Sequence, residues 1–202
     1  MFKQGIGFTK LRTLTRFILE NAEKFEWSLQ GLGMLRLYLP NNTRLHVWDT
    51  RFAFPGASPI HDHLQWGLHS TVISGRLTNY RFKEYRADEG LGAPYRCMTL
   101  KAGFNCFVKE EARDTYLGRL DAEVYNPGDS YAQEPNEIHE TVPMNGTVTI
   151  MQKAPTLDAE SARVFWPRGQ EWGSAEPRNA TPEEVIAITS NALAILIDPP
   201  SV

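Results

Sequence analysis

Short segments rich in β-branched and aromatic residues recur along most of this chain, and they limit the folds open to it. Breaks rich in Gly, Pro and Asn separate the segments, as at residues 40–42 (PNN), 55–56 (PG) and 126–129 (NPGD). The predicted strands are residues 35–39, 44–48, 67–73, 76–82, 95–100, 105–108 and 147–152. Many short strands at this spacing are typical of a sandwich or barrel. The sequence therefore predicts a mainly β fold.

Helical patterns flank the β-rich region. Apolar residues recur every three or four positions in residues 9–25, which predicts an amphipathic helix. A second helix is predicted over residues 181–196, where Thr181, Pro182 and Glu184 form a start signal. Thr181 and Glu184 have the spacing of a capping box, and proline is favoured in the first helical turn. We expect both helices to pack outside the barrel.

The 202 residues are enough for one domain with a buried core, and we expect a single domain over 1–202 with its barrel at about 34–165. The chain is 42% hydrophobic and 22% charged, which is ordinary for a globular protein. A net charge of −3 argues against nucleic acid or an anionic membrane as the main partner. The oligomeric state is left open, and a homo-oligomer is compatible with this composition.

The cysteines and the N-terminus indicate a reducing location. Cys97 and Cys106 provide neither a disulfide framework nor a close-spaced metal pair, and buried structural cysteines are the simpler interpretation. The first residues lack the apolar run of a signal peptide, and no window reaches the roughly 18 apolar residues of a membrane span. We therefore expect a cytoplasmic protein.

Three of the five histidines suggest a metal site. Residues two apart in a strand point to the same face, so His61 and His63 can present two imidazoles to one point. His139, which follows a Pro-Gly turn, can supply a third imidazole from a facing strand. Three nitrogen ligands with open positions are typical of metal chemistry on a small substrate.

Two stretches around these histidines resemble the cupin motifs. The first comprises residues 56–67 (GASPIHDHLQWG) with the later Gly75, and the second joins residues 126–129 (NPGD) to 135–139 (PNEIH). The resemblance covers about residues 35–155 and implies a cupin barrel, a double-stranded β-helix or jelly roll. The run PIHDHxxWG with the downstream PGD and IH is similar more narrowly to cysteine dioxygenase and the 3-mercaptopropionate dioxygenases.

That resemblance implies a mononuclear Fe(II) site with His61, His63 and His139 as ligands. Most cupins place a glutamate soon after the second histidine, whereas residues 64–68 (LQWGL) contain no carboxylate, which fits the three-histidine family. Imidazoles also bind Ni, Zn or Mn, so the ligands do not identify the metal. The implied partners are O2 and a small molecule.

The resemblance also suggests substrate contacts. Arg36 lies where the family holds a substrate carboxylate, with Arg51 as the alternative, and Trp66 and Met151 are the other expected substrate contacts. Where the family carries Ser-x-His-x-Tyr, this chain has Thr149, Met151 and Lys153. We expect these three side chains to point inward near the metal, with Thr149 and Lys153 as candidate catalytic residues behind the ligands. The ammonium of Lys153 either leans out of the barrel mouth, which we favour, or hydrogen-bonds the anionic group of the substrate.

His46 and His69 receive other interpretations. His46 is taken as a structural histidine on an ordinary strand. His69 shares parity with His63 but lies about 20 Å further along a regular strand, so we expect it in the core or behind the ligands.

The leading hypothesis is an iron(II) cupin dioxygenase, similar to the thiol dioxygenases, that adds O2 to a small thiol carboxylate or related chelating substrate. Two alternatives remain open: a three-histidine oxygenase for a β-diketone or aromatic substrate, which the changed residues at 149–153 favour, and a non-catalytic metal-binding cupin.

Overall fold

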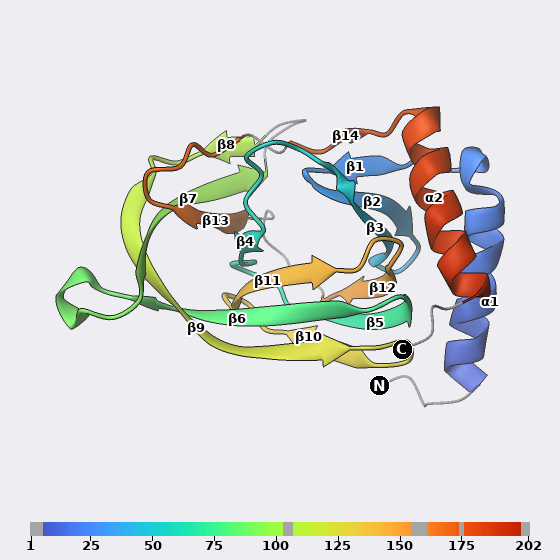
Figure 1. Cartoon of the computed structure of the whole chain (residues 1–202), viewed down its shortest axis with the longest axis horizontal. Coiled ribbons are helices and arrows are strands. Elements are labelled where there is room, and N and C mark those ends of the chain that lie inside the picture. The colour runs from blue at the N-terminus through green and yellow to red at the C-terminus, as the bar shows by residue number, and fades with distance from the viewer. Residues whose placement is uncertain (1–5, 103–106, 155–160, 174–175, 199–202) are drawn as a thin grey trace.

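The computed structural model describes residues 6–102, 107–154, 161–173 and 176–198. Cys106 and part of the predicted strand 105–108 lie outside these residues. The mainly β class is confirmed: in the described residues fourteen strands form two sheets, accompanied by an N-terminal and a C-terminal helix (Figure 1). The described residues contain no helix long and apolar enough to cross a membrane.

One of the two sheets, called the first sheet below, carries most of the N-terminal strands. Its order is β10 (Ser130–Gln133), β5 (Leu68–Ser74), β12 (Val148–Lys153), β3 (Thr43–Ala53), β2 (Leu32–Leu39), β1 (Ser28–Gln30) and β14 (Arg178–Asn179). All of its pairings are antiparallel.

The second sheet closes on itself. Its order is β13 (Ser161–Pro167), β4 (Ile60–His61), β11 (Ile138–Pro143), β6 (Leu77–Tyr85), β9 (Arg113–Tyr125), β7 (Ala93–Ala102) and β8 (Phe107–Lys109). Because β13 also pairs with β7, six of these strands form a closed antiparallel barrel, with β8 attached to its edge. Closure removes the exposed strand edges that an open sheet would present.

Both predicted helices are present, with shifted bounds. Helix α1 spans Ile6–Glu20, and the predicted continuation to residue 25 is instead a short 3₁₀ turn, η1 (Ala22–Lys24). A second such turn, η2 (Ala87–Glu89), precedes β7. Helix α2 spans Pro182–Ile197 and begins with the expected capping box, in which Thr181 and Glu184 exchange hydrogen bonds of 3.3 and 2.9 Å.

The main core lies between the helices and one face of the first sheet. Leucines, isoleucines and valines from β1, β2, β3, β5 and β12 pack there against α1 and α2, which lie side by side in Figure 1. A smaller core lies within the second sheet. The opposite face of the first sheet is therefore turned away from the helices and toward the second sheet.

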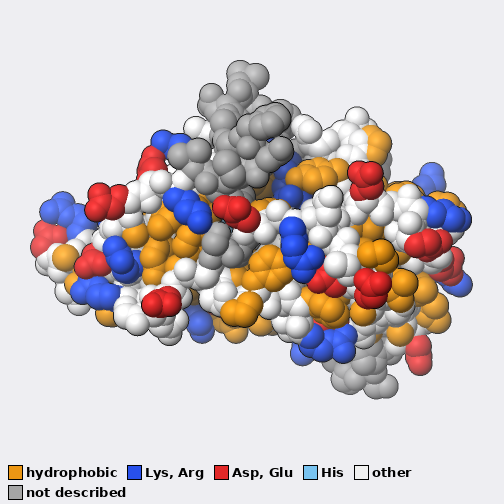
Figure 2. Space-filling model, turned by 90° about the horizontal axis from the view of Figure 1, so that it is seen from above, with side chains coloured by type: hydrophobic (Ala, Val, Ile, Leu, Met, Phe, Trp, Pro, Cys, Tyr) orange, Lys and Arg blue, Asp and Glu red, His pale blue; other side chains and the backbone are white. Residues whose placement is uncertain are grey.

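The outer surface mixes the two signs of charge. On the face in Figure 2, basic and acidic side chains of the described residues are interspersed among apolar ones. This mixture agrees with the small net charge of −3.

Candidate metal centre

His61, His63 and His139 converge as predicted. Their ligand nitrogens lie within 4.8 Å of one another, and this is the cluster of metal-ligating side chains that the described residues contain. The ring centroids are 4.4 Å apart for His61 and His139 and 5.1 Å apart for His61 and His63. Three nitrogens that share one ion at about 2.1 Å lie roughly 3–3.5 Å apart, so small ring rotations would complete the site.

The backbone reaches this arrangement differently from our prediction. Strand β4 ends at His61, so His63 is not two residues along the same strand. His61 instead pairs directly with His139 of β11. His63 follows in a loop that is held on both sides, because its carbonyl accepts the N–H of Asn136 at 2.8 Å and the next N–H, of Leu64, donates to Ser161 at 3.1 Å.

Backbone carbonyls fix the orientation of two of the rings. Nδ1 of His61 lies 3.0 Å from the carbonyl oxygen of Pro59, and Nδ1 of His139 lies 2.8 Å from that of Glu137. A carbonyl oxygen only accepts, so each Nδ1 carries the hydrogen and each Nε2 keeps its lone pair. This is the tautomer in which an imidazole binds a metal through Nε2.

The three imidazoles are also electrically neutral at neutral pH. Burial lowers the pKa of His61, and burial together with the neighbouring His61 lowers the pKa of His139 to about 3. Burial and the two other imidazoles bring the pKa of His63 well below its ordinary value. Neutral histidines are the form that ligates a metal, so the cluster can hold an ion without first losing protons.

Asp62, between two of the histidines, anchors this segment to β13. Its carboxylate is fully buried and accepts hydrogen bonds from the backbone N–H of Arg163 at 2.8 Å and from its guanidinium at 2.8 and 2.5 Å. The same guanidinium reaches Glu84 of β6 at 2.8 Å. The backbone N–H of Asp62 in turn donates to the carbonyl of Arg163 at 3.0 Å. Position 62 therefore links the histidine segment to the barrel wall.

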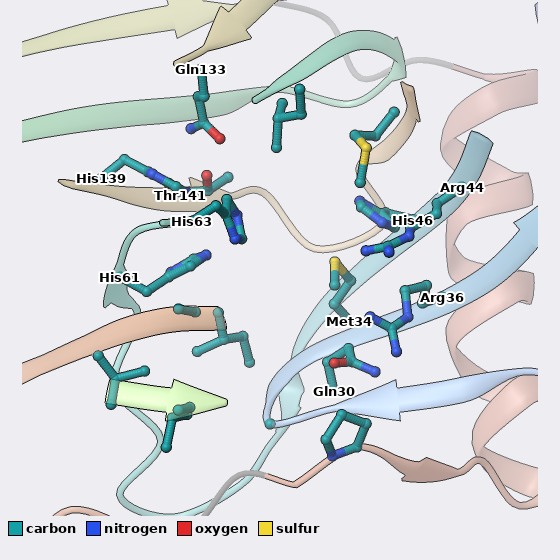
Figure 3. Close-up of a pocket in the computed structure, with 18 of the residues that line it drawn as sticks. Gln30, Met34, Arg36, Arg44, His46, His61, His63, Gln133, His139 and Thr141 are labelled. Atoms are coloured by element: carbon teal, nitrogen blue, oxygen red, sulfur yellow. The ribbon is translucent and has the colours of Figure 1, made fainter. Parts of the chain in front are cut away.

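The histidines line a cavity of about 250 Å³ between the two sheets. Figure 3 shows His61, His63 and His139 on one wall and Arg36, Arg44 and His46 on the wall opposite. The histidine wall also includes Gln133 and Thr141, and the other wall includes Gln30 and Met34. Apolar side chains fill much of the remaining lining: Trp48, Trp66, Leu68, Leu100, Met151, Val164 and Trp172.

The predicted substrate residues lie at this cavity. Arg36, Trp66 and Met151 all line it. The ring of Trp66 stacks on that of His63 with centroids 3.8 Å apart. Arg51 does not line the cavity, since its guanidinium pairs with Asp49 and is 61% exposed.

The two residues predicted behind the substrate lie close to the cavity without lining it. Thr149 is buried, and its hydroxyl accepts the indole N–H of Trp48 at 3.5 Å. The ammonium of Lys153 lies 4.9 Å from the ring centre of Trp66, on the aromatic face. Met151, between them in sequence, is the member of the set that faces the cavity.

His46, which the sequence analysis interpreted as a structural histidine on an ordinary strand, is buried in β3 and also lines the cavity beside two arginines. Arg36 and His46 are cross-strand partners, and Arg44 shares strand parity with His46, so all three side chains reach the same wall. His69, by contrast, alternates with the cavity residues Leu68 and Ser70 of β5 and faces away from the cavity.

The chain matches no known protein-family model, and no curated protein is significantly similar to it in sequence. The structure is that of a mainly β protein with a closed six-strand antiparallel barrel and a cluster of three histidines that can hold a metal ion. This combination is consistent with a cupin-like fold.

Proposed function

We propose that this protein is a mononuclear non-haem iron(II) dioxygenase of the cupin type, similar to the thiol dioxygenases. Its substrate would be a small thiol carboxylate or a related chelating molecule. The observation that carries the proposal is the position of His61, His63 and His139, which present neutral imidazoles to one point on the wall of a cavity between the two sheets.

The donor set fits iron(II). An Fe(II) ion held by these three imidazoles would supply electron exchange with O2, while keeping coordination positions for both O2 and the substrate. The same nitrogens would also bind Ni, Zn or Mn, so the ligands do not identify the metal, and iron is itself a proposal. Hydrogen bonds from Nδ1 of His61 and of His139 to backbone carbonyls keep two of the rings aimed at the site.

The residues around the cavity would bind the substrate and exclude water. Arg36 can grip a carboxylate with two parallel hydrogen bonds. Trp66 and Met151 supply apolar walls. Lys153 and Thr149 support these contacts from behind, through the ring of Trp66 and the indole N–H of Trp48. No side chain has to act as a nucleophile in this scheme.

One feature of the cavity favours a second candidate. Three tryptophans and two methionines line it, which would also suit a β-diketone or aromatic substrate. The two lining arginines favour the anionic substrate, and for this reason we place the thiol carboxylate first. A non-catalytic metal-binding barrel is the third candidate.

Oxygen consumption by the iron-loaded protein tests the proposal. We expect O2 uptake with 3-mercaptopropionate, and less with L-cysteine, because Met151 and Lys153 stand where the cysteine enzymes carry a histidine and a tyrosine. His139→Ala should abolish uptake, and His69→Ala should retain it, since His69 lies outside the cavity.

Arg36→Lys should raise KM for 3-mercaptopropionate about tenfold, the effect of a lost hydrogen bond to a charged group.

The other outcomes separate the candidates. Uptake with acetylacetone alone would favour the β-diketone oxygenase. Stable iron binding without uptake for any of these substrates would favour the non-catalytic barrel.

A further inference from the structure

His46 occupies a defined position on the cavity wall that faces the three-histidine cluster. It lies in β3, and its direct cross-strand partners are Arg36 in β2 and Thr149 in β12. Directly opposed residues of an antiparallel pair have side chains on the same face, as do residues two apart in one strand. The imidazole is therefore flanked by Arg36 across the ladder and by Arg44 two positions earlier, as Figure 3 shows.

The imidazole of His46 is incompletely satisfied. The residue is only 8% exposed, and its Nε2 has no hydrogen-bond partner within the part of the chain that the structure describes. A buried polar atom left without a partner is destabilising, because it loses the hydrogen bond that water gave it. The ring meets Trp48 edge to face at a centroid distance of 6.1 Å, a contact that offers Nε2 no acceptor. A group bound in the cavity could supply one.

The charges on this wall indicate what kind of group that is. Arg36 and Arg44 both line the cavity, and Arg44 is only 8% exposed. Two guanidinium groups on one wall can both donate hydrogen bonds to an anion bound in the cavity. His46 itself adds no charge, because burial and then Arg44 and Arg36 lower its pKa to about 3.

We propose that His46 is a substrate-binding residue that donates its Nε2–H to an oxyanion attracted to this wall by Arg36 and Arg44. The substrate then has two ends: a metal-binding donor directed at the three-histidine wall and an oxyanion directed at His46. This inference rests on the proposed function to the extent that the cavity is the substrate site. A carboxylate and a sulfonate share the required chemistry, and the experiment distinguishes them.

Calorimetric binding to nickel-loaded protein without O2 tests the inference separately from turnover. The probes are 3-mercaptopropionate, 2-mercaptoethanesulfonate and uncharged 1-propanethiol. His46→Phe keeps a flat ring of similar size without the nitrogens, and His46→Gln restores an amide N–H near the position of Nε2. His69→Phe is the matched control, because His69 lies on the same sheet but faces away from the cavity.

We expect His46→Phe to weaken binding of the preferred anionic thiol about tenfold or more, as for the loss of a hydrogen bond to a charged group. His46→Gln should recover most of the loss, and propanethiol should bind all variants alike. A preference for either anion identifies the oxyanion. Equal affinities of wild type and His46→Phe for both anions would overturn the inference, as would failure of both anions to bind the wild type. A His46 effect without O2 uptake by the iron form would retain this inference and refute the dioxygenase.

Discussion

At the residue scale, four histidines in or beside the cavity stay neutral in the folded protein at pH values where the unfolded chain would protonate them. His46 and the three clustered histidines lie in or beside one cavity, and burial lowers the pKa of each of them. An unfolded histidine has a pKa near 6.5, so below that pH the unfolded chain binds protons that the folded chain does not. The stability that these neutral imidazoles contribute is therefore fully present above pH 6.5 and is lost as the pH falls below that value.

For His46 alone the loss can be stated. With a folded pKa of about 3, lowering the pH from 7 to 5 should remove about 2 kcal/mol of the free energy of unfolding. We expect metal-free His46→Gln to lose about that much less than wild type over the same interval, as measured by urea unfolding in the presence of a chelator. Most carboxylates titrate below this window. Glu140, whose pKa burial raises, acts in the opposite direction and is common to both proteins.

Equal losses in wild type and His46→Gln would contradict the assignment of His46 as a neutral buried group. His69→Gln serves as the control, because His69 lies outside the cavity.

The sequence identified the clustered histidines but not the position of His46 at the cavity, and the reason is physical. In β3 both faces are covered, one by the helices and the other by the cavity wall, so residues 44–49 are all buried. A strand buried on both faces has no polar–apolar alternation from which its inner face can be inferred. The clustered histidines were identified because their motif resembles a known family.

At the scale of elements, a buried ion pair between Asp62 and Arg163 links the histidine segment to β13. Strand β4 contains only Ile60 and His61, too few ladder hydrogen bonds to hold the following loop. The loop is instead fixed by the buried Asp62 and by Arg163, whose side chain is 19% exposed. Sequence reasoning predicted a longer strand here, because it could not anticipate a bond between residues 101 positions apart.

Asp62→Asn tests that link. The substitution leaves the guanidinium of Arg163 with half of its buried carboxylate partners, and removing one member of a buried ion pair costs about 3–5 kcal/mol. We expect a loss of that order in the free energy of unfolding of the metal-free protein, together with a roughly tenfold weaker affinity for Zn(II), as when residues that orient metal ligands are changed.

Asp121→Asn is the matched control, because Asp121 pairs with Arg81 at the surface, where both side chains are about 40% exposed (39% and 44%). An exposed ion pair contributes about 0–1 kcal/mol. If Asp62→Asn changed neither stability nor zinc affinity by more than this control, the anchoring role of Asp62 would be wrong.

At the scale of the whole molecule, the sequence predicted the mainly β class and both flanking helices, because strand spacing and capping residues are local signals. Closure of the barrel was not predictable in the same way. It depends on the pairing of β13 with β7, which are separated by more than fifty residues. The cavity is a consequence of the same long-range arrangement, since its lining residues come from both sheets.

The central claim is that this fold brings His61, His63 and His139 together to hold one metal ion. A calorimetric titration of chelator-treated protein with Zn(II), which measures the number of ions bound and their affinity, tests it most directly. We predict one ion per chain for the wild type and for His69→Ala, and loss of most of the binding in His61→Ala, His63→Ala and His139→Ala, each still folded by circular dichroism. A wild type that binds no zinc, or a His139→Ala variant that binds it as tightly as wild type, would contradict the account.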